Sequence, residues 1–141
     1  MDTSIYKKVI LAVSFSGFLF SGYLSAVKFF TSACALSEPC PYFLGYPACW
    51  YGFVMFSVLF ISALLGILKI SKLKTVALIH LLVSSLGVLF AGYFTVPEIG
   101  RLLSGEGRYF LGLPTCAYGL VFYIILLILA VMYLKRKETE V

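Results

Sequence analysis

The chain contains one eleven-residue stretch twice. The first copy, at residues 42–52, reads Tyr-Phe-Leu-Gly-Tyr-Pro-Ala-Cys-Trp-Tyr-Gly, and the second, at residues 109–119, reads Tyr-Phe-Leu-Gly-Leu-Pro-Thr-Cys-Ala-Tyr-Gly. Eight of the eleven positions are identical: Tyr, Phe, Leu, Gly, Pro, Cys, Tyr and Gly. Each copy leads into a long apolar run. The sequence therefore predicts a chain built twice from one unit, with a cysteine at the same place in each copy.

A second pair of matching stretches lies upstream of the first. Gly17-Phe-Leu-Phe-Ser-Gly-Tyr23 matches Gly87-Val-Leu-Phe-Ala-Gly-Tyr93. The copies are offset by 70 residues here (93 − 23) and by 67 at the cysteines (116 − 49), so the second loop is three residues shorter. Small residues spaced four apart are typical of close helix packing in membranes, and they occur in both copies, at Gly17, Ser21 and Ser25 and at Gly87, Ala91 and Thr95.

The composition favours a membrane protein over a soluble one. Hydrophobic residues make up 62% of the 141 residues and charged residues only 12%, whereas a soluble domain carries about 25% charged residues. Four apolar runs, at about 9–30, 47–68, 76–96 and 114–134, are each long enough to cross a hydrocarbon core of about 30 Å. We expect an all-α integral membrane protein, a four-transmembrane-helix bundle made of two tandem helical-hairpin repeats.

This bundle is expected to be a single membrane domain over residues 1–141, with repeat 1 at about 9–68 and repeat 2 at about 76–134. The first run is long and leads straight into the motif, so it is expected to be retained rather than cleaved as a signal peptide. Each repeat has two spans, so both copies enter the membrane in the same direction. The repeats should therefore be related by a pseudo-twofold axis along the membrane normal.

The basic residues predict the orientation in the cell or inner membrane. Eight of the eleven Lys and Arg residues flank the termini and the middle turn, so we expect cytoplasmic termini and extracytoplasmic cysteine loops. The net charge of +5 is then explained by charges that flank a membrane, with lipid rather than nucleic acid as the partner. Aromatic residues near the outer face are expected to form an interfacial belt: Tyr42, Phe43, Tyr46, Trp50, Tyr51, Tyr109, Phe110 and Tyr118.

The four cysteines, Cys34, Cys40, Cys49 and Cys116, all fall on or just below the expected outer face, which is an oxidising compartment in most cells. Redox chemistry and structural disulfides are both consistent with that clustering. Four cysteines allow three pairings. Cys34 and Cys40 bound a short loop that closes easily, while Cys49 and Cys116 occupy equivalent positions that a pseudo-twofold axis could bring together. Cys49 and Cys116 each follow a proline by two residues, where we expect a helix to begin.

Three motifs together resemble the vitamin K epoxide reductase family. They are Gly22-Tyr-Leu-Ser25, Cys34-x5-Cys40, and Gly45-x-Pro47-Ala48 followed by Gly52. The resemblance covers residues 20–55, and in the second half it is one of topology alone. It implies a four-helix membrane thiol oxidoreductase without a metal. Cys34 and Cys40 would exchange with a thioredoxin-like or secreted thiol protein outside, and would pass electrons to a Cys-x-x-Cys pair at the start of the fourth helix, which reduces a bound quinone.

The fourth run reads Cys116-Ala-Tyr-Gly119 where that family has Cys-x-x-Cys. From the repeat symmetry we hypothesise that Cys49 replaces the second cysteine, so that Cys49 and Cys116 form the inner pair and all four cysteines are catalytic. The motifs assign no quinone-binding residues.

Two other functions remain open from the sequence. One is a non-enzymatic membrane subunit or scaffold whose disulfides hold the outer loops. The other is a small-molecule carrier, which is disfavoured because no Asp, Glu, Lys or Arg lies well inside an apolar run. His80 is the only histidine, and we expect it to form a hydrogen bond between helices rather than to act in catalysis or bind a metal.

Overall fold

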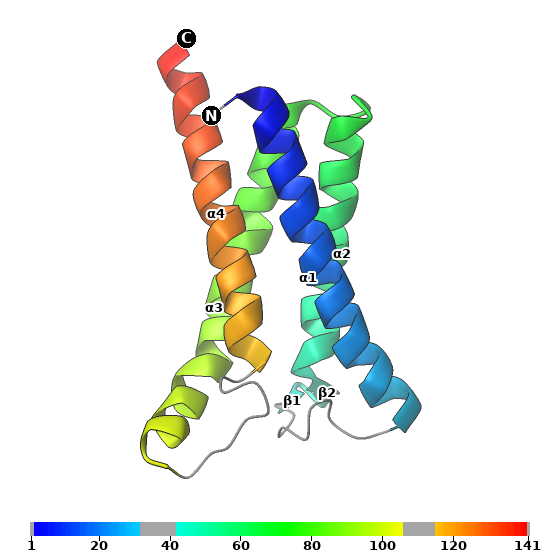
Figure 1. Ribbon diagram of the computed structural model, residues 1–141, viewed down its shortest axis with the longest axis vertical. Helices are drawn as coiled ribbons and strands as arrows, with labels where there is room; N and C mark the ends of the chain where they lie inside the picture. Colours follow the sequence, from blue (N-terminus) through cyan, green and yellow to red (C-terminus); the bar gives the residue numbers. More distant parts are fainter. Residues whose placement is uncertain (1, 32–41, 106–114, 141) are drawn as a thin grey trace.

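The computed structural model describes residues 2–31, 42–105 and 115–140. The elements follow one another as α1 (Thr3–Thr31), β1 (Tyr42–Phe43), β2 (Tyr46–Pro47), α2 (Ala48–Ile67), α3 (Leu73–Leu103) and α4 (Thr115–Glu140). Figure 1 shows the helices running alternately up and down. The two termini and the α2–α3 turn lie at one end, which we call the terminus end. The starts of α2 and α4 lie at the other, which we call the cysteine end.

The prediction of four long apolar helices is confirmed. The segments Thr3–Phe30, Trp50–Ile67, Leu73–Arg101 and Ala117–Thr139 are each long and apolar enough to cross a membrane. Large apolar side chains stay exposed along the outside of every helix, for example Leu19, Val58, Leu89 and Ile128. Such a surface is suited to contact with lipid rather than water.

The predicted boundary at Pro97 is wrong. The third apolar run was expected to end at residue 96, but α3 continues through Pro97 to Leu103. A proline inside a helix removes one backbone hydrogen bond, and the turns on either side of it still form. The helix ends where Ser104 N–H donates to the carbonyl of Gly100 at 3.1 Å and Gly105 follows with a φ of 81°, a left-handed conformation that is common just after a helix.

Two helices extend beyond their apolar runs at the terminus end. The predicted spans began near residue 9 and ended near residue 134, whereas α1 begins at Thr3 and α4 ends at Glu140. Lysine, arginine and glutamate are strong helix formers, so the charged flanks continue the helices that the apolar residues begin.

Part of the segment expected to be a loop before α2 is a short hairpin. Strands β1 and β2 pair antiparallel, with Tyr42 opposite Pro47 and Phe43 opposite Tyr46. The two residues between them, Leu44 and Gly45, have φ values of 52° and 87°, as a type I′ turn requires. Pro47 was expected in the first helical turn; it ends β2 instead, and α2 begins one residue later.

Positions that correspond in the two sequence copies make corresponding contacts. Gly17 of α1 lies under the ring of Phe56 in α2, and Gly87 of α3 lies under the ring of Tyr123 in α4. In both places a Cβ atom would overlap the ring, so the glycine of each predicted stripe lies in a close helix contact. The pairs Ser14 and Ser84, Leu59 and Leu126, and Ala63 and Ala130 are buried alike.

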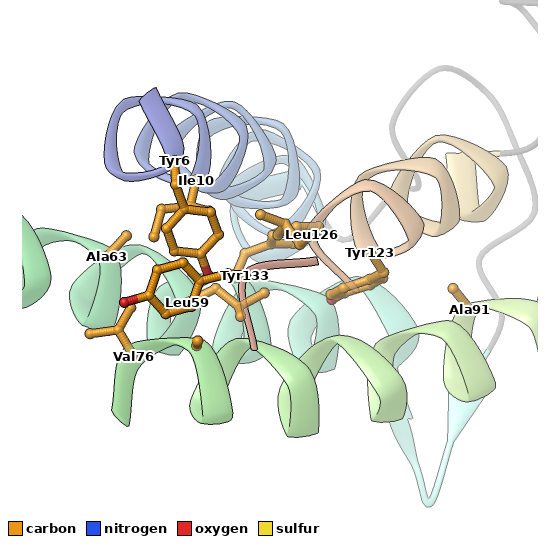
Figure 2. Packing of buried hydrophobic residues seen from close by; sticks show 11 residues of the cluster. Tyr6, Ile10, Leu59, Ala63, Val76, Ala91, Tyr123, Leu126 and Tyr133 are labelled. Atoms are coloured by element: carbon orange, nitrogen blue, oxygen red, sulfur yellow. The ribbon is translucent and has the colours of Figure 1, made fainter. Parts of the chain in front are cut away.

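The core runs along the bundle interior and is closed by aromatic residues at the terminus end. There the rings of Tyr6 in α1 and Tyr133 in α4 stack with centroids 4.6 Å apart, as Figure 2 shows. Ile10, Leu59 and Leu126, all fully buried, fill the interior below them. This packing holds the first hairpin against the second.

Candidate functional site: the cysteine end and an aromatic groove

The two repeat-related cysteines lie at the same end of the bundle. Cys49 and Cys116 are each the second residue of a helix, in α2 and α4, and both helices begin at the cysteine end (Figure 1). Each cysteine therefore lies in the first turn of its helix, although Pro47, expected to open α2, belongs to β2.

The other two cysteines of the predicted site are not described by the structure. Cys34 and Cys40 lie outside the described residues, so the pairing of the four cysteines stays a prediction. The same holds for the Cys49–Cys116 pair, for which only the helix positions are described.

An open apolar groove lies between α2 and α3, and one of its lining residues, Trp50, directly follows Cys49 in the chain. We call it the α2–α3 groove. It has a volume of about 830 Å³, within the range of about 300–1,000 Å³ that is usual for sites that bind small molecules. Its lining is almost entirely apolar or aromatic and consists of Tyr46, Trp50, Tyr51, Val54, Met55, Leu86, Leu89, Phe90 and Tyr93.

The aromatic residues of the groove are held by contacts with one another. The ring centroids of Tyr46 and Trp50 lie 6.0 Å apart, which joins the hairpin to the first turn of α2. Those of Tyr51 and Phe90 lie 5.5 Å apart and connect α2 with α3. Val54, Leu89 and Tyr93 are 60%, 72% and 71% exposed, so the groove opens on the outside of the bundle.

Two further contacts tie the groove to the centre of the bundle. On α2, the carbonyl oxygen of Gly52 accepts a hydrogen bond of 3.5 Å from the Tyr123 hydroxyl of α4. The ring of Phe56, one turn further along α2, stacks on Tyr123 with centroids 4.5 Å apart. The wall of the groove that carries Trp50 is thus supported from behind by the second hairpin.

Sequence reasoning found part of this site and missed the rest. Tyr46, Trp50 and Tyr51 were assigned to an interfacial belt, and the structure places them in the groove wall. Phe90 and Tyr93 were not singled out, although both belong to the Gly87–Tyr93 stretch that matches Gly17–Tyr23. The side chains of Tyr42, Phe43, Tyr109 and Phe110 are outside the described part of the chain.

His80 lies away from the groove and bonds as predicted. Its side chain is fully buried, and its Nε2 donates to the carbonyl oxygen of Leu59 at 3.1 Å, a hydrogen bond between α3 and α2. Among the described residues, no three His, Cys, Asp or Glu side chains are grouped so that they could hold a metal ion.

Comparison of the chain with family models, curated proteins and solved structures finds no match. The resemblance to the vitamin K epoxide reductase family therefore rests on the motif residues alone.

Proposed function

We propose that this chain is an integral membrane thiol–disulfide oxidoreductase that exchanges electrons between its cysteines and a lipid quinone. Its four helices would cross the membrane with both termini in the cytoplasm and the cysteine end outside. The two hairpins would be copies of one ancestral unit, related by a pseudo-twofold axis along the membrane normal. The matching contacts of Gly17 with Phe56 and of Gly87 with Tyr123 support this arrangement.

The observation that carries the proposal is that a residue lining the α2–α3 groove directly follows a cysteine in the chain. Trp50 lines the groove and directly follows Cys49, in the first turn of α2. The groove is apolar, is rich in aromatic side chains and opens on the outside of the bundle, where a lipid quinone dissolved in the membrane could enter. A quinone ring can stack on such side chains while its isoprenoid tail stays in lipid.

The proposed reaction between the inner cysteine pair and the quinone balances in atoms and electrons. Two thiols of an inner pair, Cys49 and Cys116, lose their two S–H hydrogens and form one S–S bond. The quinone takes up the two electrons and two protons and becomes a quinol. Cys34 and Cys40 would then reduce the inner disulfide by exchange and be reduced in turn by a thioredoxin-like or secreted thiol protein outside.

Stopped-flow spectroscopy of the reduced protein in nanodiscs tests this directly. Mixing with a short-chain quinone should produce quinol, and the proposal predicts one quinol per inner pair oxidised. Cys49→Ser and Cys116→Ser should each abolish the reaction. If both variants react as the unchanged protein does, the assignment of Cys49 and Cys116 as the inner pair is wrong. If the unchanged protein forms no quinol, the rival function is favoured, a membrane subunit whose disulfides hold the outer loops.

A further inference from the structure

Part of the lining of the α2–α3 groove occurs a second time in the chain, on α1 and α4. Applying the repeat offsets of 67 and 70 to the nine lining residues gives the same residue type at five positions. In the groove these five are Tyr51, Val54, Leu89, Phe90 and Tyr93. Their counterparts, which we call the counterpart face, are Leu19, Phe20, Tyr23, Tyr118 and Val121.

The counterpart face is also packed like the walls of the groove. The ring centroids of Tyr51 and Phe90 lie 5.5 Å apart between α2 and α3. Those of their counterparts, Tyr118 and Phe20, lie 6.1 Å apart between α4 and α1. Val121 is exposed, as the groove residue Val54 is. The protein thus carries the same walls twice, and the lining residues that differ between the copies show what is particular to the groove.

Four lining residues differ in type from their counterparts: Tyr46, Trp50, Met55 and Leu86. Tyr46 and Leu86 are exposed and Trp50 is half-buried, so these three border the opening of the groove. Met55 packs against the buried core of the bundle while it lines the groove. Met55 therefore forms the floor of the groove.

The position that corresponds to this floor carries an aromatic ring. The counterpart of Met55 is Phe122 (122 − 55 = 67). The ring centroid of Phe122 lies 6.4 Å from that of Phe20 in α1 and 6.1 Å from that of Phe56 in α2. The side chain of Phe122 is thus held between rings of two other helices.

Methionine and phenylalanine differ in how readily they make room for a ligand. A methionine side chain is unbranched, has three rotatable bonds and adapts to the shape beside it, and its sulfur makes favourable contacts with aromatic rings. A planar ligand can therefore settle against Met55. At Phe122 the same ligand would have to displace a rigid ring that two neighbouring rings hold in place.

We propose that Met55 is the specificity-determining residue of the α2–α3 groove: it admits the planar ring of a quinone, and Phe122 excludes the same ring from the counterpart face. The quinone ring lies against Met55 and Phe90, and one quinone binds per chain although the walls occur twice. This inference rests on the proposed function, because it takes a quinone as the ligand.

The single tryptophan makes a direct test possible. Trp50 is the only tryptophan of the chain and lines the groove, so its fluorescence reports binding there. We expect a short-chain quinone to quench this fluorescence saturably when it is added to the fully oxidised protein in nanodiscs, which has no thiols to react. Met55→Phe should raise the half-saturating quinone concentration severalfold. Met132→Phe is the matched control, because Met132 is an exposed residue of α4 outside the groove, and it should leave the curve unchanged.

A second variant tests the other half of the inference and does not add volume to the bundle. Phe122→Met gives the counterpart face the floor that the groove has. We expect native mass spectrometry to find one bound quinone per chain in the unchanged protein and two in the Phe122→Met protein.

Three results would overturn the role of Met55. They are the absence of saturable quenching in the unchanged protein, an unchanged curve in a folded Met55→Phe protein, and a single bound quinone in the Phe122→Met protein. If Met55→Phe does not fold, Phe122→Met still decides. Saturable binding without any quinol formed by the reduced protein would refute the proposed oxidoreductase and leave the role of Met55 in binding intact.

Discussion

The rings of Phe56 and Tyr123 stack at the centre of the bundle, with centroids 4.5 Å apart and planes 11° apart. The two residues are counterparts in the sequence repeat (123 − 56 = 67). Each ring also covers a glycine of its own hairpin, Gly17 or Gly87. A contact between equivalent residues is expected on the axis that relates two copies, so this stack is where the proposed pseudo-twofold axis passes through the protein.

Adding a methyl group under either ring should destabilise the bundle. At Gly87 a Cβ would overlap the ring of Tyr123, and that ring is held in place by Phe56. We expect Gly87→Ala to lower the free energy of unfolding by about 1–3 kcal/mol, the usual effect of overpacking. Equilibrium unfolding in mixed detergent micelles measures this, and Gly17→Ala should behave in the same way.

Gly92→Ala is the matched control for these substitutions. Gly92 lies in the same helix as Gly87, and a Cβ there would have no atom within 4 Å. Alanine favours the helix over glycine by up to about 1 kcal/mol, so Gly92→Ala should be neutral or stabilising. Equal stabilities of the Gly87→Ala and Gly92→Ala variants would contradict the close packing of the rings.

The hydrogen bond from His80 should contribute a small but measurable stability. Interhelical hydrogen bonds in membranes are worth about 0.6 kcal/mol on average and up to about 1.7 kcal/mol. We therefore expect His80→Leu to lower the free energy of unfolding by an amount in that range. His80→Gln keeps an N–H donor that can reach the carbonyl of Leu59 and should recover part of the loss. A leucine variant as stable as the histidine protein would show that the bond contributes nothing.

The orientation in the membrane can be tested with fusions at the C-terminus. Lys135, Arg136 and Lys137 follow the last apolar run, so we expect the end of α4 to face the cytoplasm. A green fluorescent protein fused after Val141 should then fluoresce, and an alkaline phosphatase fused there should be inactive. The opposite pair of results would place the cysteine end in the cytoplasm and remove the oxidising environment that the proposed chemistry needs.

The sequence predicted the helices more reliably than their ends. The four apolar runs follow from composition, and the stripes of small residues follow from spacing. Both patterns extend over many residues of a helix. Pro97 misled the prediction because a proline inside a helix usually kinks or breaks it. In this structure α3 continues past Pro97 to Leu103. The charged residues after Leu134 gave no sign of whether they would extend α4, because they suit both a helix and a solvated tail.

The groove was harder to predict than the cysteines. Cys49 and Cys116 stand out because they occupy equivalent positions in the repeat. Trp50 and Tyr93 are 43 residues apart (93 − 50), and nothing in their spacing shows that α2 and α3 bring them to one surface. Aromatic residues at the end of an apolar run are also typical of an interfacial belt, which is how Trp50 was first interpreted.

Filling the groove should impair quinone use without unfolding the protein. Leu89 lines the groove and is 72% exposed, so Leu89→Trp adds volume there with little effect on the core. We expect KM for a short-chain quinone to rise severalfold while the cysteines remain reducible by a small dithiol. Leu19→Trp is the control, because Leu19 is the repeat counterpart of Leu89 (89 − 19 = 70), is 53% exposed and belongs to α1. Equal effects of the two substitutions would argue against the α2–α3 groove as the quinone site.

The most direct test of the proposed function is a redox titration of the four cysteines in the purified protein, with and without a lipid quinone. Mass spectrometry after thiol labelling would report the state of each cysteine at each potential. An oxidoreductase predicts dithiol potentials near those of catalytic pairs, about −120 to −270 mV, and oxidation of Cys49 and Cys116 when quinone is added. Disulfides that stay oxidised below about −300 mV and do not respond to quinone would contradict the proposal and identify the cysteines as structural.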